Sequence, residues 1–232
     1  MITGSGMDHL FPAREERSLR TRFGSARAYV CAAGRREFLF LPRHGKHHSI
    51  PPHRINFRAN MQGLKEAGVE RIIATSAVGS ISRKLLVGEL GLLDQFIDLS
   101  KRHLTFFDRR PVHVDMTHPY DKGMQDLILD AAAILGMSLT TGLVYVSVDG
   151  PRYETAAEIR MFGLIGGDVV GMTGGPEAIL ANELGMRYAS VVVATNWAAG
   201  MQDRISHEEV VAMMNETAPR VKRLIEIVVE SA

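Results

Sequence analysis

The feature that most constrains the fold is an apolar run, residues 191–194, that ends abruptly on Thr195, Asn196 and Trp197. An apolar run bounded by polar residues and glycine is typical of a strand buried on both faces, as in parallel sheets. Ligands of such sheets bind at the carboxyl ends of the strands. Asn196 is therefore a candidate for contacting a ligand.

The rest of the chain alternates strand and helix patterns. Apolar and β-branched runs predict strands at 27–33, 36–42, 142–148 and 168–171, and one that begins at 71 and runs into a glycine turn before 81; the first two form a hairpin about Gly34. Helical spacing predicts helices within 53–68 and at 121–135, 154–165, 176–184 and 207–229. This alternation predicts one α/β domain over residues 1–232, with a central mixed, partly parallel sheet flanked by helices.

Composition narrows the class of partner and the compartment. The formal charge is +1, and the basic residues between Arg14 and Arg22 are interleaved with Glu15 and Glu16, so we expect a solvated face and neither nucleic acid nor membrane as a partner. Cys31 is the only cysteine, which excludes an intramolecular disulfide and a thiolate metal cluster. No apolar segment approaches the roughly 20 residues that span a bilayer, and the start has no secretory pattern, so we expect a cytoplasmic protein.

Four junctions between strand and turn carry small polar residues. They are "TGSG" at 3–6, "PRHGKHHSIPPHR" at 42–54, "ATSAVGSI" at 74–81, where a strand is expected to end near Ala77, and "VGMTGGPEA" at 170–178. Each alone could be an ordinary turn, but backbone amides, hydroxyls and an arginine fork together favour bound phosphate. The residues concerned are Ser5, Arg43, His44, Ser76, Ala77, Met172 and Thr173.

The loop at 42–54 contains four histidines, which raises the alternative of a metal site. No acidic residue or cysteine lies within this stretch, and Arg43, Lys46 and Arg54 would repel a cation. We therefore expect an anion site there and no bound metal. Further along, Tyr153 and Glu154 begin a predicted helix, where Glu154 alone would be read as a partner of the helix dipole.

With these residues assembled, the chain resembles the trimeric purine nucleoside phosphorylases and methylthioadenosine phosphorylases. Nearly the whole length takes part, through "RHGKHHSIPPHRINFRANMQGLKEAGV", "TSAVGSI", "GPRYETAAEIRMF" and "GMTGGPEAILANELGMRYA" in the family's order. The resemblance implies an α/β nucleoside phosphorylase fold, a homotrimer, and cleavage of a purine nucleoside by inorganic phosphate, a co-substrate, without metal or organic cofactor.

The resemblance also assigns roles position by position. Ser5, Arg43, His44, Ser76, Ala77 and Thr173 match phosphate-binding positions. The positions that match substrate contacts are Met172 on ribose and base, Tyr153 beside the base, His48 near the sugar, His113 lent to a neighbouring subunit, and the strand-end group Asn196, Trp197 and Ala198. Because only Met1, Ile2 and Thr3 precede Gly4, we expect either a very short first strand or a chain that begins later than its relatives.

Two residues indicate a 6-oxopurine base. A donor aimed at N7 stabilises the charge that develops on the departing purine, and the Asn196 amide can donate there and face a 6-oxo group, where adenosine-type members resemble this strand but have aspartate. The Glu154 carboxylate can accept from the N1–H of hypoxanthine or guanine. Asn196 and Glu154 are thus the predicted catalytic residues.

The residues expected near the 5′ end of the sugar resemble two different branches of the family. His207 matches a position that is histidine in nucleoside-type members and apolar in methylthio-type members, although a histidine beginning a helix can also be a plain surface residue. The segment around 43–60 resembles the methylthio branch. The prediction is phosphorolysis of inosine or guanosine to free base and ribose 1-phosphate, with S-methyl-5′-thioinosine phosphorylase as the alternative.

Two other classes are less well supported. A non-catalytic nucleotide-binding module would explain the glycine loop and the basic cluster but not Glu154 and Asn196. A dinucleotide oxidoreductase is disfavoured because "TGSGMDH" lacks the third glycine and no strand-end acid follows about 20 residues on. The sequence does not separate hypoxanthine from guanine nucleosides.

Overall fold

A computed structural model describes residues 1–231, and over that range it contains a nine-stranded mixed sheet in the order β2-β3-β4-β1-β5-β8-β7-β6-β9. The strands are β1 (Ile2–Thr3), β2 (Glu15–Thr21), β3 (Gly24–Ala33), β4 (Arg36–Pro42), β5 (Arg71–Ser80), β6 (Leu90–Asp98), β7 (Thr140–Ser147), β8 (Val169–Gly171) and β9 (Arg187–Trp197). The predicted α/β class with a mixed, partly parallel sheet is confirmed.

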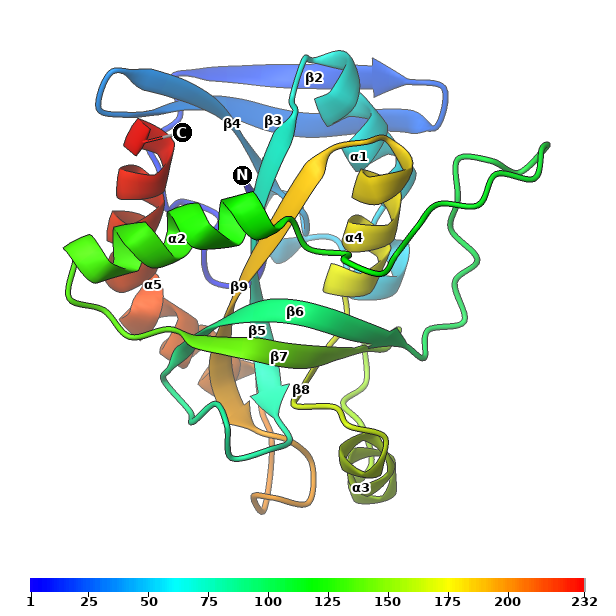
Figure 1. Ribbon diagram of the computed structural model, residues 1–232, viewed down its shortest axis with the longest axis vertical. Helices are drawn as coiled ribbons and strands as arrows, with labels where there is room; N and C mark the ends of the chain where they lie inside the picture. Colours follow the sequence, from blue (N-terminus) through cyan, green and yellow to red (C-terminus); the bar gives the residue numbers. More distant parts are fainter. Residues whose placement is uncertain (232) are drawn as a thin grey trace.

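The central part of the sheet closes on itself (Figure 1). β9 pairs parallel with β5 and antiparallel with β6, β7 pairs parallel with β6 and β8, and β8 returns antiparallel to β5. The predicted hairpin is β3 and β4, and β1 joins it to the ring by running parallel to both β4 and β5. The ring therefore brings the ends of β5, β8 and β9 close together.

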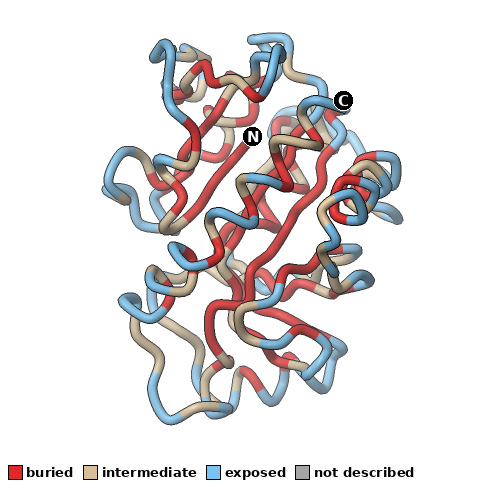
Figure 2. Tube along the Cα trace, turned by 90° about the vertical axis from the view of Figure 1, so that its left-hand side faces the viewer, coloured by how far each residue is buried: buried red, intermediate tan, exposed pale blue. Residues whose placement is uncertain are grey.

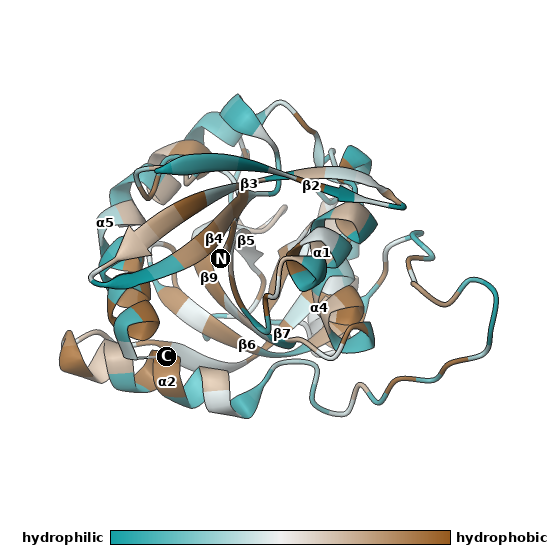
Figure 3. Cartoon of the chain, turned by 90° about the horizontal axis from the view of Figure 1, so that it is seen from above, coloured by the Kyte–Doolittle hydropathy of each residue, from teal (hydrophilic) through white to brown (hydrophobic). Residues whose placement is uncertain are grey.

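Helices cover the sheet on two sides. They are α1 (Phe57–Glu66), α2 (Lys122–Ile134), α3 (Ala156–Leu164), α4 (Gly174–Glu183) and α5 (His207–Ser231). Figures 1 and 3 show α1 with α4 on one side and α2 with α5 on the other, while α3 lies at the end of the molecule. Local signals explain where several begin, since the Asn56 and Asp121 side chains accept the N-terminal amides of α1 and α2.

The core follows the central strands. Every residue of β9 from Tyr188 to Asn196 is buried, as the apolar run predicted, and Figure 2 shows buried backbone running through the molecule along its strands. One apolar cluster includes Phe57, Leu64 and Tyr145, and a second one includes Ile128 and Leu224. Burying aliphatic and aromatic side chains of this size contributes about 1.5–3 kcal/mol each.

The prediction missed two strands, and two of its misplaced boundaries bear on the cavity described below. β2 is a charged edge strand whose side chains are mostly exposed, so the expected solvated face is correct but its pattern hides a strand. β6 was not predicted either. β5 continues to Ser80 instead of ending near Ala77, because Gly79 passes through an irregularity in the ladder, and α3 begins at Ala156, so Glu154 lies ahead of the helix.

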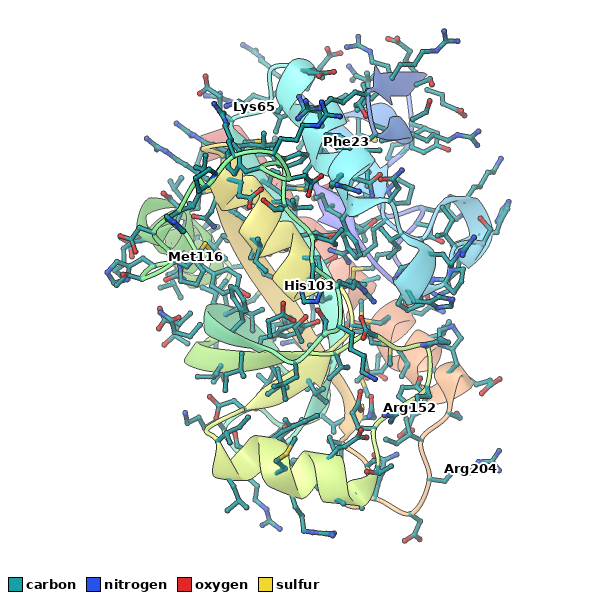
Figure 4. The ribbon with its side chains drawn as sticks, turned by 90° about the vertical axis from the view of Figure 1, so that its right-hand side faces the viewer. Phe23, Lys65, His103, Met116, Arg152 and Arg204 are labelled. Carbon is teal, nitrogen blue, oxygen red and sulfur yellow. The ribbon has the colours of Figure 1, made fainter. Side chains whose placement is uncertain are left out.

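Residues 99–121 form an extended segment that leaves the body of the molecule (Figures 1 and 3), with Met116 on it in Figure 4. The Glu183 carboxylate anchors its base by accepting from the Thr105 hydroxyl at 2.6 Å and from the Phe106 amide at 2.7 Å. Among residues 1–231, no helix has the length and apolar character needed to cross a membrane.

Candidate active site

A cavity of about 360 Å³ opens beside the carboxyl ends of β5, β8 and β9. This is the place that the sequence predicted for a ligand. The predicted site residues that line it are Ser5, Arg43, His44, His48, Ser76, Ala77, Tyr153, Glu154, Met172, Thr173, Asn196 and His207. Residues far apart in the sequence therefore converge on one cavity.

Three predicted substrate contacts lie elsewhere. Ala198 is buried in a small apolar cluster with Val146 and Phe162, and Trp197 uses its backbone to bond Gln202 and Asn196. His113 is exposed on the segment that leaves the body of the molecule. None of the three lines the cavity of this chain, and the segment at 99–121, which carries His113, extends outward from the body of the molecule.

Arg43 forms a buried ion pair that the sequence did not reveal. Its Nε donates to Glu177 Oε1 at 2.6 Å, its Nη2 donates to Oε2 at 2.8 Å, and its Nη1 donates to the Thr75 carbonyl at 2.6 Å. Both side chains are almost fully buried, and the Tyr188 hydroxyl also donates to Glu177 at 2.9 Å. The only sequence signal for Glu177 was an acid within the mostly apolar helix "GGPEAILA".

This pairing corrects the expected use of the arginine fork. The edge formed by Nε and Nη2, which would suit a phosphate, already holds a carboxylate. One hydrogen remains on Nη1 and one on Nη2 for a ligand in the cavity. The loop before Ser5 approaches this group so closely that a Cβ on Gly4 would lie 2.7 Å from Arg43 Nη1, which explains the glycine.

Two hydroxyls, those of Ser76 and Thr173, line the cavity together with Arg43. Ser76 Oγ is buried and makes no hydrogen bond, and the Thr173 side chain stands at the start of α4 without capping it. A buried hydroxyl without a partner is costly, so a ligand that bonds to it gains that free energy back. With the two free hydrogens of Arg43, these groups suit an oxyanion.

The histidines of the cavity form a stacked set. His44 and His48 stack with ring centroids 4.1 Å apart, and His48 lies 5.2 Å from His207, which is exposed at the start of α5. Burial, with His48 and Arg43 nearby, lowers the pKa of His44 to about 3, so its ring is neutral. Because Nδ1 bonds to the Ile50 carbonyl at 2.9 Å, Nδ1 carries the proton and Nε2 is an acceptor.

No metal site emerges from these side chains. Within residues 1–231, no three histidine, cysteine or acidic side chains are grouped so that they could hold an ion. The structure thus offers nothing in favour of the metal alternative for the four histidines at 42–54.

Asn196 owes its position to an irregularity in β9. Val78 pairs with Ala194 but Gly79 pairs with Asn196, so Thr195 is an extra residue in the ladder. Adjacent side chains of a regular strand point to opposite faces, whereas here Thr195 and Asn196 both line the cavity. The Thr195 hydroxyl donates to Asn196 Oδ1 at 2.8 Å, and Asn196 Nδ2 donates to the Trp197 carbonyl at 2.9 Å, which fixes the amide and leaves one N–H free.

Glu154 is not needed by the helix that follows it. Thr155 caps α3 and Glu158 completes a capping box, so the first amides of α3 are satisfied without Glu154. Burial raises the pKa of Glu154, which lines the cavity. Figure 4 shows Arg152, beside this loop, and Arg204, in the loop after β9, toward the same end of the molecule.

Comparison with known proteins gives a consistent family. Residues 2–230 match the model of the phosphorylase superfamily. A 6-oxopurine nucleoside phosphorylase of Pyrococcus furiosus is 46% identical, with 97% of this chain and 89% of that protein covered. A probable S-methyl-5′-thioinosine phosphorylase of Methanopyrus kandleri is 44% identical, with 99% and 91% covered.

Solved structures agree on the fold. Methylthioadenosine phosphorylase from Schistosoma mansoni in complex with adenine superimposes with a TM-score of 0.92 at 28% identity, covering 99% of this chain and 89% of that one. The fold around this cavity is therefore shared with a solved enzyme that was crystallised with adenine.

Proposed function

This chain belongs to the phosphorylase superfamily, and from that premise we propose that it is a purine nucleoside phosphorylase that cleaves 6-oxopurine nucleosides with phosphate. The observation that carries the proposal is the pairing of an anion-binding end, at Arg43, Ser76 and Thr173, with a base-binding end, at Asn196 and Glu154, in one cavity. A phosphate and a purine placed at these ends would have the sugar between them.

The reaction exchanges one bond for another. A phosphate oxygen forms a bond to C1′ while the C1′–N9 bond breaks, and the electron pair of the broken bond leaves with the purine. The purine anion takes up the proton that monohydrogen phosphate gives up, so the products are ribose 1-phosphate and the neutral free base. The free Nδ2 hydrogen of Asn196 donates to N7 as negative charge develops, and such donors act more strongly on the transition state than on the ground state. The Glu154 carboxylate accepts from N1–H, which adenine lacks.

The side chains proposed to bind phosphate suit the charge and the single proton of monohydrogen phosphate. The Arg43 guanidinium is partly neutralised by Glu177, and the two hydroxyls donate without adding charge. The neutral His44 ring has an acceptor at Nε2, which suits the P–OH of monohydrogen phosphate. We propose no metal and no organic cofactor for this reaction.

The 5′ substituent decides between two substrates. His48 and His207 present imidazoles at the cavity, and a 5′-hydroxyl can bond to them whereas a methylthio group cannot. This favours inosine and guanosine. Methylthioinosine stays the second candidate because of the 44% identity to the Methanopyrus kandleri relative.

We also propose a homotrimer. The support is the resemblance to trimeric family members together with residues 99–121, which extend from the body and carry the exposed His113. In such an assembly His113 would reach the cavity of a neighbouring copy. Light scattering that gave the 25.6 kDa mass of one chain would contradict it.

The test is product analysis with inosine, methylthioinosine and adenosine, each with and without phosphate. We expect hypoxanthine and ribose 1-phosphate from inosine only when phosphate is present. Base release at equal rates without phosphate would identify a hydrolase, and preference for adenosine over inosine would refute the assignment of Asn196 and Glu154.

A further inference from the structure

The buried phenol of Tyr145 occupies the start of α4, directly behind the anion-binding end of the cavity. Its oxygen accepts from the Thr173 amide at 3.1 Å and from the Gly174 amide at 3.2 Å. These are unpaired donors at a helix N-terminus, the groups that in other proteins bind an anion directly. In this chain a neutral side chain satisfies them, since burial raises the pKa of Tyr145 to about 12.

The glycines of the "GMTGG" motif make room for this phenol. A Cβ on Gly171 would lie 2.6 Å from the Tyr145 oxygen, and a Cβ on Gly174 would lie 3.3 Å from Tyr145 Cζ. The turn from Gly171 to Gly174 is therefore wrapped closely around the tyrosine tip. Both residues between the two glycines, Met172 and Thr173, line the cavity.

This arrangement leaves the Thr173 side chain free. Its backbone amide is held by the phenol and its hydroxyl makes no cap bond, although it stands at the cap position of α4. We propose that Tyr145 is a positioning residue for phosphate, which holds the 171–174 turn so that Thr173 presents its hydroxyl to the anion. The proposal rests on the proposed phosphorylase function.

The test is the Tyr145→Phe variant, which keeps the ring and removes only the acceptor. We expect the KM for phosphate to rise about five- to tenfold, as for loss of a buried hydrogen-bond partner. The KM for inosine at saturating phosphate should change less than twofold. Tyr120→Phe is the matched control, because the Tyr120 hydroxyl is equally buried but has no partner, and it should leave the phosphate KM unchanged.

A double-mutant cycle separates positioning from general destabilisation. If Tyr145 acts through Thr173, then Tyr145→Phe has little further effect on the phosphate KM once Thr173→Val is present. Additive effects of the two changes, or a Tyr145→Phe variant that loses thermal stability with an unchanged phosphate KM, would overturn the proposal. Absence of phosphate-dependent cleavage by the wild type would instead overturn the proposed function.

Discussion

The ion pair between Arg43 and Glu177 predicts a coupling that can be measured. Both side chains are nearly inaccessible to solvent, at 1% and 2% exposure, so removing one partner leaves the other charged and buried. Breaking such a pair costs about 3–5 kcal/mol. Since whole domains are stable by about 5–15 kcal/mol, Arg43→Met and Glu177→Gln should each lose a large fraction of the free energy of unfolding.

The double variant should lose less than either single one. With methionine at 43 and glutamine at 177, no charge is left unpaired, and the new amide can still accept from the Tyr188 hydroxyl. Some cost stays, because the Thr75 carbonyl loses its donor. We expect a coupling free energy of about 3 kcal/mol or more between the two positions.

Urea unfolding followed by circular dichroism, at one fixed protein concentration, gives the four free energies of the cycle. Single variants that each lose less than about 1 kcal/mol, or losses that simply add, would refute the reasoning. A second test of the ion pair measures how much phosphate raises the melting temperature. In Glu177→Gln the guanidinium lacks its anion, so phosphate should raise the melting temperature more than it does in the wild type, and a smaller rise would contradict the placement of Arg43 at the anion.

Four further predictions concern the base, the sugar and pH. Asn196→Asp puts an acceptor where the amide donates, so inosine cleavage should fall about 100-fold or more while the adenosine-to-inosine ratio of kcat/KM rises; an unchanged ratio contradicts the role. His207→Val should shrink the preference for inosine over methylthioinosine, by up to about 1–3 kcal/mol, and steady-state kinetics on both substrates will show whether the ratio moves. Because burial raises the pKa of Glu154, the acid limb of kcat/KM for inosine should lie above the ordinary glutamate pKa and should disappear from the pH profile of Glu154→Gln. The pKa of His44 is lowered from 6.5 to about 3, so in that window the unfolded chain binds a proton that the folded chain does not; stability should fall as the pH drops from 6.5 toward 3, and urea titrations of His44→Gln should show a flatter dependence.

The sequence predicted those parts of the site that depend on one residue type at the end of one element. Asn196 after an apolar run, and Thr173 in a glycine-rich turn, could be found because strand ends and turns have recognisable compositions. The comparison with the family's substrate contacts then added roles for Glu154 and His207, and both residues line the same cavity in the structure.

The parts that could not be predicted depend on contacts between distant elements. Glu177 is an unremarkable acid in its own helix, and only the packing of α4 against α1, β7 and β9 brings it to Arg43. Tyr145 reads as one apolar residue of a buried strand, and nothing local shows that its hydroxyl meets Gly174. β2 was missed because its charged sequence follows no apolar alternation, and its pairing with β3 supplies the hydrogen bonds that hold it.

The extra residue in β9 means that base recognition is encoded partly in the length of a strand. Thr195 has no counterpart on β5, and without it the ladder between Ala194 and Asn196 would become continuous. Asn196 would keep its partner Gly79 and its face of the strand, because Ala194 and Asn196 would then alternate as neighbours, but its Oδ1 would lose the Thr195 hydroxyl that orients the amide. A single-codon deletion at this point therefore removes the hydrogen bond that fixes the base-reading amide while leaving Asn196 on the cavity. Mutant libraries that contain only substitutions, without insertions or deletions, do not test how the number of residues in β9 affects base recognition.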